Sequence, residues 1–371
     1  MKSMNVKISS RQSFCTYFII VSLSLGMPNL LIRELRQDFW QAILVAMVIE
    51  AMLGFFLYKM GRNYINQTIF QYSEKILGKT LGKISVGIFS IYFISVAITL
   101  TQALIDFFGS VVMPETPKYV FAFLLLLVST YACCSGIEVI MRLSEIIAPF
   151  VLGSFLFVTL FNIGNLEFDN LRPVFRHGIG EILRGSMLPS AWFGICIIMG
   201  VLMAYHNNPK AMYKVKLMGV GLGILAITTS MFFVIMVIGV EVSSRQLYSI
   251  YNLARKVDVG NFIQRTEAFQ IVSWTAGAFL TLALFHYAAV EGLKHIFSSK
   301  SRMFLGIGIA VVIFVFAIFI NPTSIDKTVF FKNIFGVYGL TVEICGVSLL
   351  YIIYSLKQKF KVFKKRSSNE R

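Results

Sequence analysis

Charged residues are scarce in this 371-residue sequence: Asp, Glu, Lys and Arg make up 14%, whereas hydrophobic residues make up 57%. A soluble domain carries about one quarter charged residues, so this composition excludes an ordinary soluble protein. Apolar runs of about 20 residues recur instead, which is the length that crosses a bilayer as a helix. The alternating segments of about ten residues typical of a transmembrane barrel do not occur. The sequence therefore predicts an all-α polytopic membrane protein.

The sequence also lacks the usual signatures of metal sites and enzymes. Its five cysteines include no CxxC pair, and its four histidines are scattered. This pattern predicts neither a metal site nor a disulfide framework. A P-loop, a hydrolase elbow and a GxGxxG followed by a strand are all missing. We therefore expect no cofactor and no enzymatic activity. No A-x-A-type cleavage site follows the first apolar run, so we expect a retained first span rather than a signal peptide.

Hydrophobic patterning predicts ten spans in one transmembrane domain covering residues 1–371. They are expected at 14–32, 39–58, 84–112, 119–136, 143–163, 186–205, 217–240, 268–290, 303–320 and 334–356. The net charge of +16 lies in the loops between spans, which argues against nucleic-acid binding. Of the 34 Lys and Arg residues, 22 fall on the side of the N-terminus. The positive-inside rule then places both termini in the cytoplasm, and the basic tail 357–371 could contact anionic membrane lipid.

Two spans carry breaks at matching positions. The first span, 14–32, is interrupted around Ser24–Pro28, within the stretch "VSLSLGMPNLLIREL" (21–35). The sixth span, "SMLPSAWFGICIIMGVLMAY" (186–205), is interrupted around Trp192–Gly194. Ten spans divide into two sets of five, approximately 14–163 and 186–356. Because each set crosses the membrane an odd number of times, the second set begins on the opposite side and lies inverted in the membrane. Such paired interruptions point to a midplane binding site in transporter folds, where free backbone groups and helix N-termini suit a carboxylate. Simple kinking of packed membrane helices is the alternative.

Acidic residues inside the apolar spans form a second group of candidates. A charge at the bilayer centre costs about 3 kcal/mol on insertion scales. Glu50 and Glu343 therefore either border a water path or are buried structural acids. In "GIEVIMRLSEI" at 136–146, Glu138, Arg142 and Glu145 share one helix face and can form an ion ladder. This motif is either a hinge that fixes the fourth and fifth spans or a gate.

Several segments together resemble the endospore germination permease family, the B-type subunits of nutrient germinant receptors in the amino acid–polyamine–organocation superfamily. The segments that carry the resemblance are "TIFQYSEKILGKTLGKI" (68–84), "MPETPKYV" (113–120), "GIEVIMRLSEIIAPF" (136–150), "NLRPVFRHGIGEILRGSMLP" (170–189) and "FIQRTEAFQIVSW" (262–274). The resemblance implies a LeuT-like fold of two inverted five-helix repeats. It also implies nutrient sensing in the inner membrane of the spore, beside A-type and C-type receptor subunits.

Combined with the two breaks, the resemblance implies a pocket for a small germinant, most plausibly an amino acid, between spans one, three, six and eight. The expected lining residues are Ser24, Gly26, Met27, Tyr92, Val96, Trp192, Phe193, Gly194, Ala283 and Tyr287. Its apolar walls and few backbone donors suit a small apolar amino acid. A free-standing amino acid transporter of the same fold and a membrane scaffold with a vestigial pocket are the alternatives.

Overall fold

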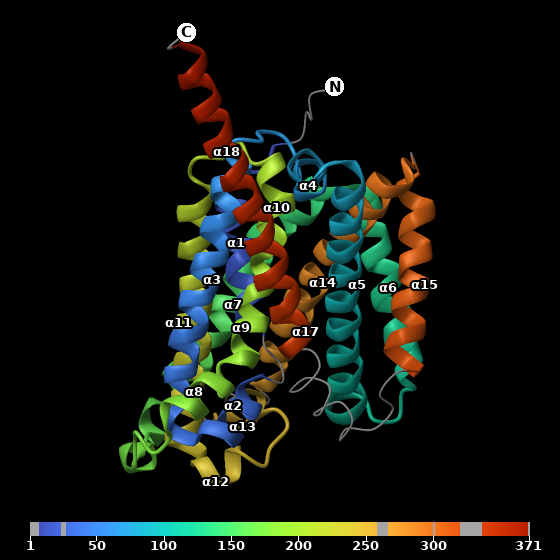
Figure 1. Ribbon diagram of the computed structural model, residues 1–371. Helices are drawn as coiled ribbons and strands as arrows, with labels where there is room; N and C mark the ends of the chain where they lie inside the picture. The colour runs from blue at the N-terminus through green and yellow to red at the C-terminus, as the bar shows by residue number, and fades with distance from the viewer. Residues whose placement is uncertain (1–6, 24–26, 258–265, 300, 320–335, 370–371) are drawn as a thin grey trace.

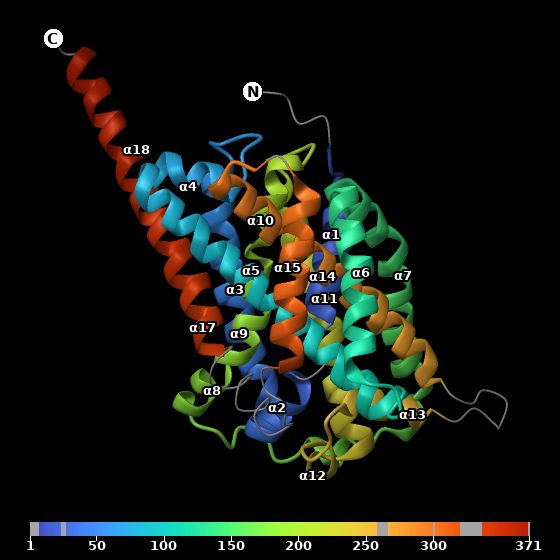
Figure 2. The ribbon, with the colours of Figure 1, turned by 90° about the vertical axis from the view of Figure 1, so that its right-hand side faces the viewer.

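The computed structural model describes residues 7–23, 27–257, 266–299, 301–319 and 336–369, with side chains as far as 360 in the last range. Figures 1 and 2 show a bundle of long helices with the N- and C-terminal segments at the same end. We call this the terminal end, and the end that carries α2, α8, α12 and α13 the opposite end.

The first half of the chain begins with two helices, α1 (Ser10–Ser22) and α2 (Met27–Leu35). A short turn, η1 (Arg36–Asp38), leads from α2 into α3 (Phe39–Gly61). The short α4 (Ile69–Leu77) then precedes α5 (Lys79–Phe107), which ends in a π-helical turn, η2 (Phe108–Val112). The helices α6 (Lys118–Ser135) and α7 (Ile137–Phe161) complete this half.

The second half begins with a segment of short helices at the opposite end: η3 (Ile163–Asn165), η4 (Phe168–Leu171) and α8 (Ile179–Gly185). The sixth span follows as α9 (Met187–Gly194), η5 (Ile195–Ile198), α10 (Met199–Leu202) and η6 (Met203–Tyr205). Next come α11 (Met212–Ile238), the short α12 (Val240–Ser243) and α13 (Ser249–Arg255), α14 (Glu267–Phe297) and α15 (Arg302–Phe319). The last span is α17 (Gly336–Leu340), η8 (Thr341–Gly346) and α18 (Val347–Asn369).

Within the described residues, nine helical stretches are long and apolar enough to cross a membrane. These nine match the expected spans two to ten. The expected first span is divided between α1 and α2, and 24–26 lie outside the described residues, so the count of ten stays a prediction. Several helices begin about five residues earlier than expected, among them α5 at Lys79, α7 at Ile137 and α11 at Met212, because the helical pattern continues past the apolar run.

Local sequence signals explain several helix ends. Ser9 and Gln12 form a reciprocal capping box at the start of α1. Gly78 and Gly136 separate α4 from α5 and α6 from α7 with φ values of 87° and 99°, a left-handed conformation that glycine adopts without strain. The corner at Gly78 joins the short α4 to the long α5, and the corner at Gly136 joins the two long helices α6 and α7.

The sixth span lies at the centre of the bundle. In its apolar stretch 94% of the residues are buried, against 22% in α15. The helix α1 is similarly enclosed, packed against α11 and α7. By contrast, α5, α6 and α15 expose large apolar side chains such as Ile91, Phe123 and Phe304, as expected of helices that face lipid. The first and sixth spans therefore form the core that the other helices surround.

Candidate functional site

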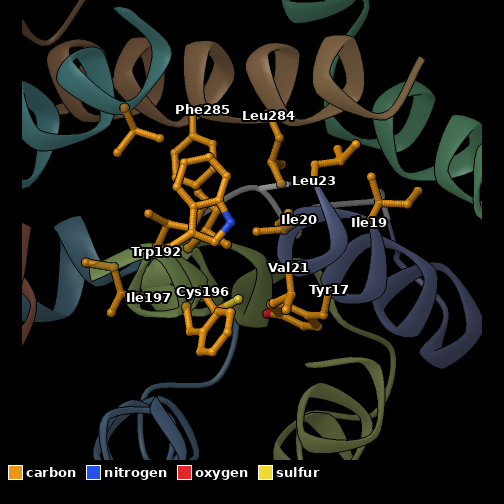
Figure 3. Close-up of a cluster of buried hydrophobic side chains, with 14 of the residues drawn as sticks. Tyr17, Ile19, Ile20, Val21, Leu23, Trp192, Cys196, Ile197, Leu284 and Phe285 are labelled. Carbon is orange, nitrogen blue, oxygen red and sulfur yellow. The ribbon is translucent and has the colours of Figure 1, made fainter. Parts of the chain in front are cut away.

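Three elements meet in the apolar centre of the bundle. Figure 3 shows Ile20 and Leu23 of the first span beside Trp192 of the sixth, with Leu284 and Phe285 of α14 above them. All these side chains are buried. The first, sixth and eighth spans thus meet at the centre of the bundle, and the contact between them is mainly apolar.

The sixth span changes its helix type just after the predicted break at Trp192–Gly194 but is not interrupted there. The α-helix α9 ends at Gly194 and continues as the 3₁₀ turn Ile195–Ile198 without an intervening loop. A 3₁₀ stretch inside a helix often marks a hinge or local strain. In the first span, α1 ends at Ser22 and α2 begins at Met27. Because 24–26 lie outside the described residues, the break in the first span stays a prediction.

The predicted pocket residues lie on four elements. Ser24 and Gly26 fall outside the described residues, and Met27 opens α2. The others are all buried: Tyr92 and Val96 on α5, Trp192, Phe193 and Gly194 at the end of α9, and Ala283 and Tyr287 on α14. Tyr92 and Gly194 contact the same carboxylate, that of Glu343.

Tyr287 has other partners, towards the terminal end. Its hydroxyl lies 3.1 Å from that of Tyr205, at the end of the sixth span. The guanidinium of Arg302 lies 5.0 Å from the centre of the Tyr287 ring and also binds Glu291 at 2.8 Å. The last turns of the sixth and eighth spans are thereby linked. Glu291 also forms an ion pair with Lys294, three residues further along α14, at 3.1 Å.

Glu343 is buried where four spans converge. It belongs to the π-helical turn η8, and its side chain is 0% exposed. The hydroxyl of Tyr92 donates a hydrogen bond to Oε1. Oε2 lies against Gly194, where a Cβ atom would overlap the carboxyl group. Oε2 has no hydrogen-bond partner among the described residues, so this acid bridges the third and sixth spans with only one donor.

Glu50 has a cationic partner that the sequence analysis missed. It forms an ion pair with Lys216 of α11, and each side chain is 1% exposed. Lys216 fits against Gly54, one turn from Glu50 on α3. The expected seventh span, 217–240, leaves Lys216 in the preceding loop, and this is wrong because α11 begins at Met212. The signal available was Glu50 itself, since a buried acid usually has a partner.

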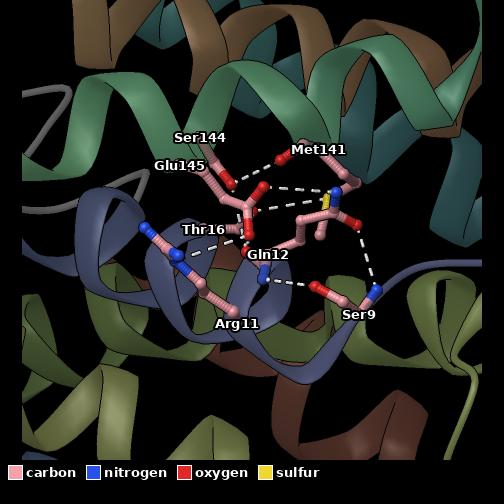
Figure 4. A network of polar contacts seen from close by, with 7 residues as sticks. All are labelled: Ser9, Arg11, Gln12, Thr16, Met141, Ser144 and Glu145. Carbon is pink, nitrogen blue, oxygen red and sulfur yellow. Dashed lines mark hydrogen bonds and ion pairs between the residues drawn. The ribbon is translucent and has the colours of Figure 1, made fainter.

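Figure 4 shows a polar network that ties α1 to α7 at the terminal end. The carboxylate of Glu145 lies 3.6 Å from Arg11 and accepts a hydrogen bond from Gln12 at 3.5 Å. Glu138 pairs with Arg142 as its spacing predicts. Glu145 pairs with Arg11 instead of extending a ladder along α7, so the motif at 136–146 connects the first and fifth spans.

The segment before α1 is attached to the end of the sixth span. The backbone of Ile8 donates to Tyr205 at 2.8 Å and accepts from Asn207 at 3.0 Å. Burial lowers the pKa of the neighbouring His206, which keeps this imidazole neutral at neutral pH. Its Nδ1 accepts a hydrogen bond from the backbone of Asn208 at 3.0 Å. The first and sixth spans are therefore joined at the terminal end.

A cavity of about 610 Å³ opens at the terminal end beside this junction. Its lining is polar and carries both signs of charge: Thr68, Gln71, Glu74, Lys79, Lys83, Tyr205, Glu291, Lys294, His295, Ser298 and Ser299. Tyr205 is the contact between this cavity and Tyr287. No group of three or more potential metal ligands occurs in the described part of the chain.

Sequence comparisons identify relatives with one common role. The model of a family described as "Spore germination protein" matches residues 7–325. Spore germination protein YndE of Bacillus subtilis is 28% identical over 288 residues, covering 76% of this chain and 78% of the relative. Spore germination protein KB of the same organism is 26% identical and 80% of each chain is covered. Spore germination protein A2 is 24% identical, with 85% and 87% covered.

Comparison with solved structures identifies the fold. A closed conformation of Mhp1, a nucleobase-cation-symport-1 family transporter with bromovinylhydantoin bound, matches with a TM-score of 0.66. The match covers 93% of this chain and 78% of that one, at 12% identity. A Na⁺-coupled sialic acid symporter matches with a TM-score of 0.53 over the same shares, also at 12% identity. The all-α membrane architecture is therefore the LeuT-like transporter fold.

Proposed function

Because this chain belongs to the spore germination protein family, we propose that it is the nutrient-sensing subunit of a spore germinant receptor. In this proposal the protein binds a small germinant, most plausibly an amino acid, and transmits the resulting conformational change to partner subunits. The observation that carries the proposal is the family match over residues 7–325, combined with a transporter fold whose central span changes helix type after Gly194. A fold alone would not identify a function.

The proposed pocket lies between the first, third, sixth and eighth spans, within two inverted repeats at about 14–163 and 186–356. We retain the residues predicted from the sequence: Ser24, Gly26, Met27, Tyr92, Val96, Trp192, Phe193, Gly194, Ala283 and Tyr287. The convergence of α1, α9 and α14 in Figure 3 supports this placement. The ligand would shift the equilibrium between two conformations by binding one of them more tightly.

The proposed location and partners follow from the same family. We place the protein in the inner membrane of the spore, with both termini in the cytoplasm and with A-type and C-type receptor subunits beside it. The excess of Lys and Arg on the side of the termini supports this orientation. The junction of Ile8 with Tyr205 supports a mechanism in which the first and sixth spans move together at the terminal end.

The test is binding by the purified full-length protein. Thermal unfolding is measured with amino acids at millimolar concentration, because a ligand that binds only the folded state stabilises it by mass action, by about 2.7 kcal/mol at 100 times its Kd. Val96→Phe fills the proposed pocket and should abolish the shift. Ile91→Phe, on the exposed face of the same helix, is the matched control and should retain it.

Uptake into liposomes separates sensing from transport. A sensor requires occupancy without turnover, so we expect binding without sustained accumulation of labelled amino acid. Saturable uptake by the isolated protein would establish the transporter alternative, which the likeness to symporters favours. If amino acids, nucleosides and sugars all fail to bind, the chain is a scaffold and the sensing proposal is wrong.

A further inference from the structure

Three charged side chains are buried together among the second, sixth, seventh and tenth spans, and their charges do not cancel. Glu50 and Lys216 neutralise each other in one ion pair. Glu343 forms no ion pair among the described residues. A fully ionised cluster would hold one uncompensated negative charge inside the membrane, which is among the most unfavourable arrangements in a protein.

The surroundings of Glu343 stabilise a neutral carboxyl group better than an anion. A buried carboxylate usually accepts several hydrogen bonds, but in the described residues Glu343 accepts one, from Tyr92 to Oε1. The other oxygen, Oε2, faces the backbone at Gly194 with no donor. This leaves Oε1 to accept the tyrosine hydrogen bond and Oε2 to carry a proton.

The other titratable or charged groups that the structure describes around Glu343 supply no free positive charge that would stabilise its anion. Tyr92 of α5 and Tyr338 of α17 are neutral phenols whose rings lie 6.3 Å apart. Cys196 of η5 is a buried thiol in the same region. Lys216 of α11 is already engaged in the ion pair with Glu50 of α3.

From this geometry we propose that Glu343 is a proton-binding site, occupied in the conformation described here. The proton is taken from solvent water onto Oε2 and neutralises the acid. The site joins Tyr92 of the third span to Gly194, where the sixth span changes helix type. Loss of the proton leaves an anion against the sixth-span backbone and favours a conformation in which that backbone moves away from α17 and η8. This inference goes beyond the germinant proposal and does not depend on the identity of any ligand.

The test is infrared spectroscopy of the purified full-length protein at about pH 8, where ordinary Asp and Glu side chains are ionised. A protonated carboxyl group has a carbonyl stretch distinct from that of a carboxylate, and the band shifts in D₂O. We expect this band in the wild-type protein and its loss in Glu343→Gln. It should remain in Glu50→Gln, which removes the other buried acid. Absence of the band from the wild-type protein, or its persistence in Glu343→Gln, would overturn the proposal.

Two further measurements keep the test decisive. If Glu343→Gln does not fold, Tyr92→Phe should raise the frequency of the band, because the carbonyl loses its hydrogen-bond donor. An unchanged frequency contradicts the assignment. Spectra are also compared in sodium chloride and in choline chloride. If sodium removes the band, the site binds a metal cation in place of a proton, and the proposal is wrong. Failure of these tests leaves amino acid binding at the germinant pocket untouched.

Discussion

Two buried glutamates in this protein are stabilised in different ways. Glu50 has a lysine beside it, contributed by a helix from the other half of the chain. Among the described residues, Glu343 has only the hydroxyl of Tyr92 and a glycine that leaves room for its carboxyl group. An ion pair holds two helices together at fixed charge, whereas an acid with a single neutral donor can change its charge. The first arrangement suits a static support, and the second suits a part that responds to its surroundings.

Among the substitutions that test this comparison, removal of Lys216 should lower the stability of the protein most. Lys216→Met leaves Glu50 buried without a counter-charge, and breaking a buried pair typically costs about 3–5 kcal/mol. We expect a large fall in the melting temperature of the purified protein. The control is the double variant Glu50→Gln with Lys216→Met, which should recover most of the stability. If the single variant is as stable as the wild-type protein, the pair is not a structural support.

Gly194→Ala should have the next largest effect, because the added Cβ would overlap the carboxyl group of Glu343. Overpacking of this kind costs about 1–3 kcal/mol. Gly221→Ala in α11 is the matched control, since nothing lies within 4 Å of its added Cβ. That control should be neutral or stabilising. Thermal unfolding measures both, and Glu343→Ala combined with Gly194→Ala should relieve the loss if the overlap is its cause.

Tyr92→Phe sharpens the comparison by measuring the hydrogen bond to Glu343. A bond between neutral groups contributes about 0.5–1.5 kcal/mol, whereas a bond to a charged group contributes about 1.5–3 kcal/mol. We expect the smaller loss, obtained from unfolding free energies. The same substitution in a Glu343→Gln background should cost a similar amount. A loss in the larger range that disappears in that background would show that Glu343 is ionised.

The smallest effect is expected from an exposed ion pair. Glu138 and Arg142 are four residues apart on α7 and both are exposed. Such pairs contribute about 0.3–0.5 kcal/mol. Arg142→Gln should therefore lower the melting temperature only slightly, and added salt should remove the difference. An effect as large as that of Lys216→Met would instead indicate that this motif has a mechanical role.

The sequence predicted those features that depend on neighbouring residues. Apolar runs located nine of the spans because length and hydrophobicity alone determine whether a helix can cross the membrane. The Glu138–Arg142 pair followed from a spacing of four residues. Gly and Pro residues predicted an interruption in the sixth span near Trp192–Gly194. The chain remains helical there and changes from α-helix to a 3₁₀ turn at Ile195, so the interruption stays a prediction.

The contacts between distant spans could not be predicted in this way. Tyr92 and Glu343 are 251 residues apart, and only the packing of the tenth span beside the third brings them together. Lys216 follows two other lysines near the start of α11, so its composition resembles that of a loop. Glu145 forms an ion pair with Arg11 of α1 because α1 packs against α7. Each of these depends on which helices are neighbours, which hydrophobicity does not encode.

The ion pair between Glu50 and Lys216 has a consequence for how the protein is made. The two residues are separated by 166 positions in the chain. At translation rates of about 5–20 residues per second, the acid enters the membrane on the order of ten seconds before its lysine leaves the ribosome. During that interval the acid in the second span has no lysine partner. Either a proton neutralises it or the insertion machinery keeps it out of contact with lipid. The ion pair can form only once the seventh span has entered the membrane beside the second, so this link between the two halves of the chain forms late.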